Sequence, residues 1–118
     1  MTPIKKQKLI NDCIRQYVDN KYKIIPDTIR INRHNTINHE LAKTVVAFNL
    51  MQNGKEIYTE VRLKGGGIAD IFIPEDFAIV EILASETAEQ LAEKIKKYPW
   101  GLNVDSLNAD EVIREVKI

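Results

Sequence analysis

The sequence predicts an α/β sandwich, a β-sheet buried between helices. Three observations favour this fold class. Apolar residues recur at helical spacing near both ends of the chain, they alternate or run continuously over three central segments, and helical spacing returns after those segments. From residue 38 to residue 104 the predicted order is therefore a helix, three strands, a helix and a strand.

Residues 3–20 are expected to form an amphipathic N-terminal helix. Pro3 suits its first turn, because the missing N–H has no partner there in any case. The apolar stripe of this helix contains Ile10, Cys13, Ile14, Tyr17 and Val18. Cys13 is the only cysteine, so we expect a packed thiol and no internal disulfide. Residues 21–36 are irregular and connect the helix to the rest of the chain.

A second helix is expected from Asn38, acting as its N-cap, to about Gln52. The apolar residues predicted to face the core from this helix are Leu41, Val45 and Phe48. Residues 56–64 then alternate between apolar and polar side chains, as in a strand, and three glycines make the next turn.

Two apolar runs, residues 68–73 and 77–84, are predicted to be buried strands of one hairpin. Thr87 begins a capping box that predicts the start of a third helix. A last short strand is expected at 100–104, and a terminal helix at 109–116.

Each run of the hairpin contains a single charged residue, Asp70 in the first and Glu81 in the second. Burying an ionised carboxylate is costly unless a partner, a proton or a metal ion compensates the charge. If Ile73 pairs with Ala78, a four-residue loop joins the strands and both carboxylates project from the same face. A slip of one residue would place them on opposite faces. The alternative is that Glu81 reaches water at a strand end or sheet edge.

Charge is distributed unevenly along a chain whose formal net charge is zero. Residues 1–36 contain eight Lys/Arg and three Asp/Glu, whereas residues 37–118 contain nine and fourteen. This asymmetry favours a phosphate-rich partner that contacts the basic residues 1–36 and a cation site within the acidic residues 37–118. A basic helix docked on an acidic surface of the same protein would explain it equally. We divide the single expected domain into a basic helix and connector (1–36), a core (37–104) and a C-terminal helix (105–118).

The beginning of the chain lacks the uninterrupted apolar stretch of a usual secretory signal, and no segment reaches membrane-spanning length. We therefore expect a cytoplasmic protein that does not enter a membrane.

The predicted core resembles the PD-(D/E)XK nuclease superfamily over about residues 37–104. Gly66-Gly67-Ile68-Ala69-Asp70 resembles the glycine-rich entry to the aspartate of the motif, and Val80-Glu81-Ile82-Leu83 occupies its Glu-x-Lys segment. Glu40 stands where many members carry an acid on a helix. The resemblance is nearest to small archaeal and viral members such as Holliday-junction resolvases. Leu83 replaces the lysine of the motif.

The resemblance implies a restriction-endonuclease-like core and a hydrolase, an endonuclease dependent on Mg²⁺ or Mn²⁺. Asp70 and Glu81 would be catalytic metal ligands. Glu40 would be an auxiliary ligand or, equally, a solvated glutamate in the first turn of its helix. Lys64 and Lys94 are the candidates to replace the missing lysine, and each is also explained as a surface residue. A replacement requires an ammonium nitrogen within about 5 Å of the carboxylates.

The implied partner is DNA, including structured DNA, and a homodimer is expected by analogy with two-fold DNA junctions. The residues expected to contact phosphate are Lys5, Lys6, Lys8, Arg33 and Lys64. His39 is expected at the surface, although it could touch metal or phosphate. Trp100 is expected in the core, although Trp100 and Tyr98 could stack on bases. Because Leu83 is not a lysine, the alternative is an inactive relative that binds DNA or protein.

Overall fold

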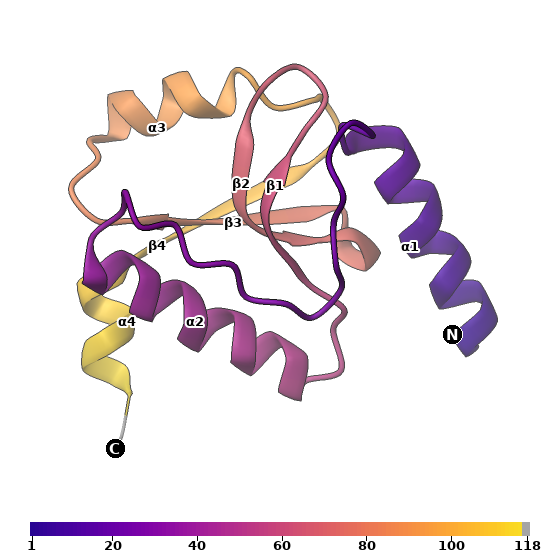
Figure 1. The fold of residues 1–118 in the computed structure, drawn as a ribbon, viewed down its shortest axis with the longest axis horizontal. Coiled ribbons are helices and arrows are strands. Elements are labelled where there is room, and N and C mark those ends of the chain that lie inside the picture. Colours follow the sequence, from indigo (N-terminus) through magenta and orange to yellow (C-terminus); the bar gives the residue numbers. More distant parts are fainter. Residues whose placement is uncertain (117–118) are drawn as a thin grey trace.

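The computed structural model describes residues 1–116 and has a mixed α/β fold (Figure 1). These residues form four α-helices, one short 3₁₀ helix and a four-stranded sheet. In chain order the elements are α1 (Pro3–Tyr17), α2 (Ile37–Gln52), β1 (Tyr58–Arg62), β2 (Ile68–Ile73), η1 (Pro74–Asp76), β3 (Ala78–Leu83), α3 (Ala88–Ile95), β4 (Asn103–Asn108) and α4 (Ala109–Glu115). The predicted order of a helix, three strands, a helix and a strand is confirmed.

The strands lie in the order β1-β2-β3-β4. The first three pair antiparallel, whereas β4 pairs parallel to β3. α3 makes the crossover between β3 and β4, since parallel neighbours need a long connection. The last strand begins three residues later and ends four residues later than predicted, at Asn108.

Helix ends follow local capping chemistry. Thr36, and not Asn38, caps α2, because its Oγ1 accepts a hydrogen bond from the backbone N–H of His39 at 3.1 Å. The capping box predicted at Thr87 is present at the start of α3. α1 ends at Tyr17, earlier than predicted, because Val18 leaves the helix and forms a β-bridge with Leu63.

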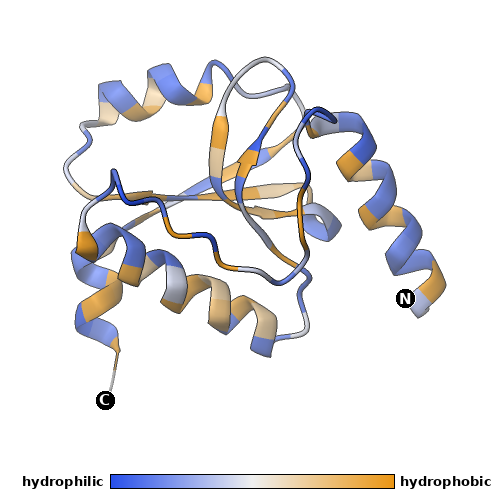
Figure 2. Cartoon of the chain, in the orientation of Figure 1, coloured by the Kyte–Doolittle hydropathy of each residue, from blue (hydrophilic) through white to orange (hydrophobic). Residues whose placement is uncertain are grey.

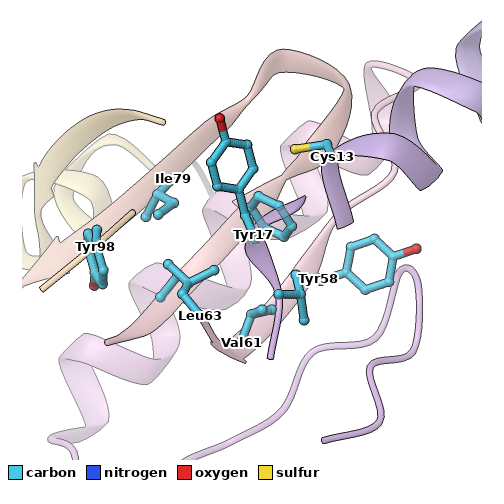
Figure 3. Packing of buried hydrophobic residues seen from close by; sticks show 10 residues of the cluster. Cys13, Tyr17, Tyr58, Val61, Leu63, Ile79 and Tyr98 are labelled. Carbon is cyan, nitrogen blue, oxygen red and sulfur yellow. The ribbon is translucent and has the colours of Figure 1, made fainter. Parts of the chain in front are cut away.

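Two apolar clusters lie on opposite faces of the sheet. One packs α1 and the residues after α3 against the sheet (Figure 3), and its buried members are Cys13, Tyr17, Val18, Tyr58, Val61, Leu63, Ala69, Phe72, Ile79 and Tyr98. The other packs α2 and α4 against the sheet. Burial raises the pKa of the Cys13 thiol to about 12, so the prediction of a packed thiol is confirmed.

The hairpin register is the one that favours a shared site. Ile73 pairs with Ala78 and Ile71 pairs with Val80. The loop between them contains η1 followed by Phe77 in a left-handed conformation (φ 49°). The pairing ends at Ile71 and Val80, so Asp70 and Glu81 are the next residue of each strand just beyond the paired positions.

β1 does not keep the predicted alternation. Ile57 packs in the cluster beneath α2, whereas Val61 and Leu63 pack in the cluster on the opposite face. The change of face coincides with Glu60, whose φ of 53° is left-handed. A left-handed conformation costs a residue with a side chain roughly 1–2 kcal/mol, so surrounding contacts must hold it.

The face that α2 turns toward the sheet was predicted incorrectly. Leu41 and Phe48 are 50% and 52% exposed. The residues that α2 buries are instead His39, Glu40, Ala42, Lys43 and Ala47. Small alanines let the helix approach the sheet closely, and Glu40 and Lys43 form an ion pair with each other.

Trp100 is 96% exposed, so the prediction that it packs in the core is wrong. It lies on a turn that ends at Gly101, where φ is 104°. A Cβ on Gly101 would lie 2.4 Å from the hydroxyl oxygen of Tyr17. The turn is therefore pressed against α1, and the indole projects outward.

In the part of the chain that the structure describes, no helix has the length and apolar character that crossing a membrane requires.

Candidate active site

Asp70 and Glu81 are buried carboxylates from the neighbouring strands β2 and β3, and Glu81 is only 1% exposed. Burial and the negative charge of Asp70 both raise the pKa of Glu81 above its usual value, more than Lys94 and Tyr98 lower it. Burial would also raise the pKa of Asp70. The hydrogen bond from His39 and the charge of Lys94 outweigh that effect and hold this pKa below its usual value. The two acids therefore belong to one electrostatic site.

Asp70 is fixed by its own hairpin and by α2. Its Oδ2 accepts a hydrogen bond from the backbone N–H of Ile82 at 2.8 Å and lies 3.4 Å from Nε2 of His39. The first contact ties the carboxylate to the strand that carries Glu81, and the second supplies a positive charge when His39 is protonated. Asp70 is thus held as an anion beside a protonatable neighbour.

Glu81 receives two partners from α3 and the residues that follow it. Nζ of Lys94 lies 2.6 Å from Glu81 Oε2. The hydroxyl of Tyr98 donates a hydrogen bond to Oε1 of the same carboxylate. Both side chains come from one segment of the chain. Lys94 lies in α3, and Tyr98 follows the end of this helix at Ile95. The segment delivers a cation and a neutral donor to one buried acid.

The expectation of an ammonium within about 5 Å of the carboxylates is met by Lys94. Lys64 is placed elsewhere, because its Nζ donates to the backbone oxygen of Arg15 in α1 at 2.7 Å. Of the two lysines considered, the structure brings Lys94 to the acids and directs Lys64 to α1. Leu83, at the position of the motif lysine, ends β3.

His39 connects the acid pair to Glu40. Its Nδ1 lies 2.9 Å from Glu40 Oε2 while its Nε2 faces Asp70. The Asp70 hydrogen bond raises the pKa of His39 to about 9 against the opposing effect of burial, and Glu40 adds to the increase. The prediction of a surface His39 is therefore wrong, because this residue is buried, and its raised pKa favours the protonated form at neutral pH.

Glu40 lies on the far side of His39 from Asp70. Its Oε1 accepts hydrogen bonds from the backbone N–H of Asn32 and from Nζ of Lys43, the latter at 2.9 Å. Burial opposes its ionisation, but these bonds and His39 keep its pKa below the usual value. Glu40 therefore does not join Asp70 and Glu81 as a third ligand, which corrects that expectation.

Lys43 completes the network from the interior of α2, where it is fully buried. Its Nζ lies 2.9 Å from Glu60 Oε1, 2.9 Å from Glu40 Oε1 and 2.6 Å from the backbone oxygen of Arg30. These contacts explain how Glu60 is held in its left-handed conformation. The spacing of Glu40 and Lys43, three residues apart on a helix, was the sequence signal for this pair.

Neighbouring charges in the site have opposite signs except where Asp70 adjoins Glu81. The cations are Lys43, His39 and Lys94, and the carboxylates are Glu60, Glu40, Asp70 and Glu81. With His39 protonated, the carboxylates exceed the cations by one. A proton on Glu81 or a bound cation beside it would compensate that remaining charge. Buried groups with perturbed pKa values often cluster at functional sites, which makes this network the candidate site.

Among residues 1–116, the structure contains no group of three or more His, Cys, Asp or Glu side chains placed to bind one metal ion. The remaining donor set is the Asp70–Glu81 pair. Two carboxylates fit Mg²⁺ or Mn²⁺, because such hard cations take oxygen ligands, and Mg²⁺ commonly uses one or two carboxylates together with water and substrate phosphate.

The basic residues expected to contact DNA do not gather around the acids. α1, which carries Lys5, Lys6 and Lys8, lies at the opposite side of the molecule from α3 (Figure 1). Lys6 is further engaged by the backbone oxygen of Gly54 and by Glu75. Arg33 lies in the segment before α2 and lines the same surface hollow as Glu40.

No protein-family model, curated protein or solved structure matches this chain. Conclusions about its chemistry therefore depend on the geometry of the site.

Proposed function

We propose that this protein is a metal-dependent nuclease of the PD-(D/E)XK kind that cleaves phosphodiester bonds in DNA, including structured DNA. One observation carries the proposal: the Lys94 ammonium lies on Glu81, and Asp70 accepts a hydrogen bond from the backbone N–H of Ile82, the residue next to Glu81. An acid pair on adjacent strands with a nearby lysine is the arrangement that the superfamily motif implies. The order of a helix, three strands, a helix and a strand supports the same restriction-endonuclease-like core.

Asp70 and Glu81 would hold Mg²⁺ or Mn²⁺ through their oxygens. When bound, such an ion lowers the pKa of a coordinated water and withdraws charge from the phosphate. Lys94 then takes the role of the motif lysine, positioning the attacking water or stabilising charge on the phosphate. Its side chain is 40% exposed, so it can reach a substrate while remaining close to Glu81.

The other side chains position these groups. His39 keeps Asp70 ionised and so able to act as a ligand, while Glu40 and Lys43 hold His39 in place. Tyr98 directs Glu81 by donating to the oxygen that Lys94 does not contact. Each role follows from a contact that does not require the metal.

Cleavage of linear, forked and four-way DNA with Mg²⁺ or Mn²⁺ tests the proposal. Asp70→Asn and Glu81→Gln conserve shape and remove the negative charge, so we expect both to abolish cleavage. Asp105→Asn, at an exposed acid of β4, serves as the control and should leave it unchanged. Metal binding is measured separately, because an ion that binds only the folded state raises the Tm. Equal cleavage by all variants would contradict the proposal.

A second candidate is a nuclease-fold protein without activity that binds DNA or protein. The observation in its favour is that the site is already satisfied: no buried side-chain polar atom of the described residues lacks a hydrogen-bond partner. This candidate expects salt-sensitive DNA retention without cleavage, weakened when Lys5 and Lys8 are neutralised. Metal-dependent cleavage by the wild type that Glu81→Gln abolishes would exclude it.

A further inference from the structure

Trp100 is the single tryptophan of the chain, and its side chain projects into solvent with 96% of the residue exposed. Tryptophan is highly buried on average in folded proteins, so an indole presented in this way is unusual. Between residues 84 and 106, all of which the structure describes, no other large apolar side chain is exposed. Trp100 is therefore a single aromatic group among polar neighbours and not a member of an apolar patch.

The backbone that carries Trp100 is fixed on both sides. Before it, the Tyr98 hydroxyl is hydrogen-bonded to Glu81 and lies 3.0 Å from the backbone oxygen of Ile68. After it, Gly101 lies so close to the Tyr17 hydroxyl that a Cβ would not fit. An aromatic side chain on a fixed turn loses little conformational freedom when a ligand covers it, so more of the contact free energy is retained.

A surface hollow lies beside the indole. Its lining is mainly apolar and includes Ile95, Pro99, Leu102 and Val104. Among residues 1–116, Lys96 is the one charged residue that lines this hollow. A nucleobase has a flat face that stacks on an aromatic ring, whichever base it is. The hollow gives such a ring a place against Trp100.

Positive charge adjoins the indole on the side of α3. Lys96 and Lys97 follow the helix directly, and the end of α3 and the segment that leaves it are hydrophilic (Figure 2). Lys96 pairs with Glu93 at 2.8 Å, but the two side chains are 71% and 72% exposed, and such pairs contribute little and open readily. Lys64 is near, but its Nζ is engaged by Arg15, so we assign phosphate contacts to Lys96 and Lys97.

The acidic side chains of this region lie outside the hollow. Glu89 and Glu93 line a different hollow of α3, together with Lys94 and Lys97. Asp105 lies on β4 and does not line the hollow beside Trp100. The immediate surroundings of the indole are therefore apolar and basic.

An aromatic platform with cations beside it is complementary to a single strand of DNA. Unpaired bases stack on aromatic side chains while ammonium groups contact the phosphates. The bases of a duplex already stack on each other, so the indole has no free base face to contact there. A membrane surface would require a broad apolar face, and Trp100 has no exposed apolar neighbour along its segment.

We propose that Trp100 stacks on an unpaired base of DNA while Lys96 and Lys97 contact the phosphates of the same strand. The inference rests on the proposed function in that it names the substrate, DNA with a single-stranded segment. Trp100 follows Tyr98, which contacts Glu81, and two residues span at most about 7 Å. A strand held at Trp100 is therefore bound by the segment that also reaches the acid pair.

The fluorescence of the only tryptophan reports directly on stacking. We expect a single-stranded thymidine oligonucleotide, added in EDTA so that no metal-dependent cleavage occurs, to quench the Trp100 emission. A duplex or an abasic oligonucleotide of the same length should quench it much less, and vesicles of anionic lipid should not shift it. Absence of quenching by the single strand would overturn the proposal, as would a blue shift with vesicles alone.

The anisotropy of a labelled oligonucleotide measures affinity under the same conditions. We expect Trp100→Ala to weaken binding about 5- to 100-fold, whereas Trp100→Phe should retain most of it. The matched control is Phe48→Ala, at a half-exposed aromatic residue of α2, which should bind like the wild type. Unchanged binding by Trp100→Ala would overturn the proposal.

A pair of double variants tests the phosphate contacts. Lys96→Met/Lys97→Met should weaken binding and reduce its salt dependence, whereas Lys5→Met/Lys8→Met should change neither. The reverse ranking would assign DNA binding to α1 and overturn the proposal. Circular dichroism melting establishes that each variant folds. Glu81→Gln should bind the strand at least as tightly as the wild type, so loss of cleavage and loss of strand binding are separable.

Discussion

Nζ of Lys94 lies 2.6 Å from Oε2 of Glu81, although the two residues belong to different elements thirteen positions apart. The helix that carries Lys94 is the crossover between two parallel strands, and one of these strands carries Glu81. A crossover helix must pass over the sheet, so its lysine can reach Glu81. The neighbouring residues of β3 are apolar and could not pair with this acid. Topology thus brings Glu81 a cation that β3 itself does not contain.

Replacing Glu81 with Gln is expected to stabilise the metal-free protein. Burial raises the pKa of Glu81 in the folded protein. The free energy of unfolding therefore falls as the pH rises from about 4.5 through the raised value, because Glu81 ionises over this range. Gln conserves the shape and carries no charge. Urea unfolding at pH 8 should show a gain of about 1–3 kcal/mol. A loss of stability of similar size would contradict this account of the acid pair.

His39 should make stability depend on pH in the neutral to alkaline range. Its pKa is raised from 6.5 to about 9 in the folded protein, so its stabilising contribution is complete below about pH 6.5 and is lost as the pH rises toward 9. Unfolding free energies of the wild type should therefore fall between pH 7 and pH 9, by roughly 1–3 kcal/mol. His39→Asn should remove most of this slope. His34→Asn, at the other and exposed histidine, is the matched control and should retain it.

Lys43→Met is expected to destabilise the fold strongly. It removes the cation between Glu40 and Glu60 and leaves two carboxylates without their shared partner, at a cost of about 3–5 kcal/mol. Adding Glu40→Gln to Lys43→Met should recover part of the loss, because it neutralises one of those acids. Thermal and urea unfolding measure both. If the single variant were as stable as the wild type, the buried network would have no structural role.

Much of the acid pair was readable from the sequence. Asp70 and Glu81 each interrupt an apolar run, and a four-residue loop is enough to bring the two positions together just beyond the last paired residues, Ile71 and Val80. Thr87 predicted the start of α3 for an equally local reason, since capping depends on residues three positions apart. Lys94 could be named as a candidate from the helix stripe, but its contact with Glu81 depends on how the crossover lies over the sheet.

Other features depended on contacts between distant segments. Leu41 and Phe48 were predicted to face the core because apolar residues usually do, and α2 instead buries Glu40 and Lys43, whose partners lie in the connector and β1. His39 and Tyr98 gave no local signal, since each meets its carboxylate only in the folded chain. Trp100 projects outward because Gly101 packs on Tyr17, more than eighty residues earlier.

Gly101→Ala and Trp100→Ala should differ sharply in their effect on stability. A Cβ at Gly101 meets the Tyr17 hydroxyl at 2.4 Å and sits on a left-handed backbone, so the substitution should cost about 1–3 kcal/mol. Trp100 is almost fully exposed, and its removal should change stability by no more than about 0.5 kcal/mol. The opposite ranking in urea unfolding would mean that the indole is buried.

The central claim is that Lys94 replaces the lysine missing at position 83, and relocation of the charge tests it most directly. DNA cleavage with Mn²⁺ is compared for the wild type, Lys94→Met, and Lys94→Met combined with Leu83→Lys, with Lys64→Met as the control for loss of a lysine. We expect Lys94→Met to lower the rate about 100-fold or more, Leu83→Lys to restore a substantial part of it, and Lys64→Met to cleave like the wild type. Undiminished cleavage by Lys94→Met would contradict the claim.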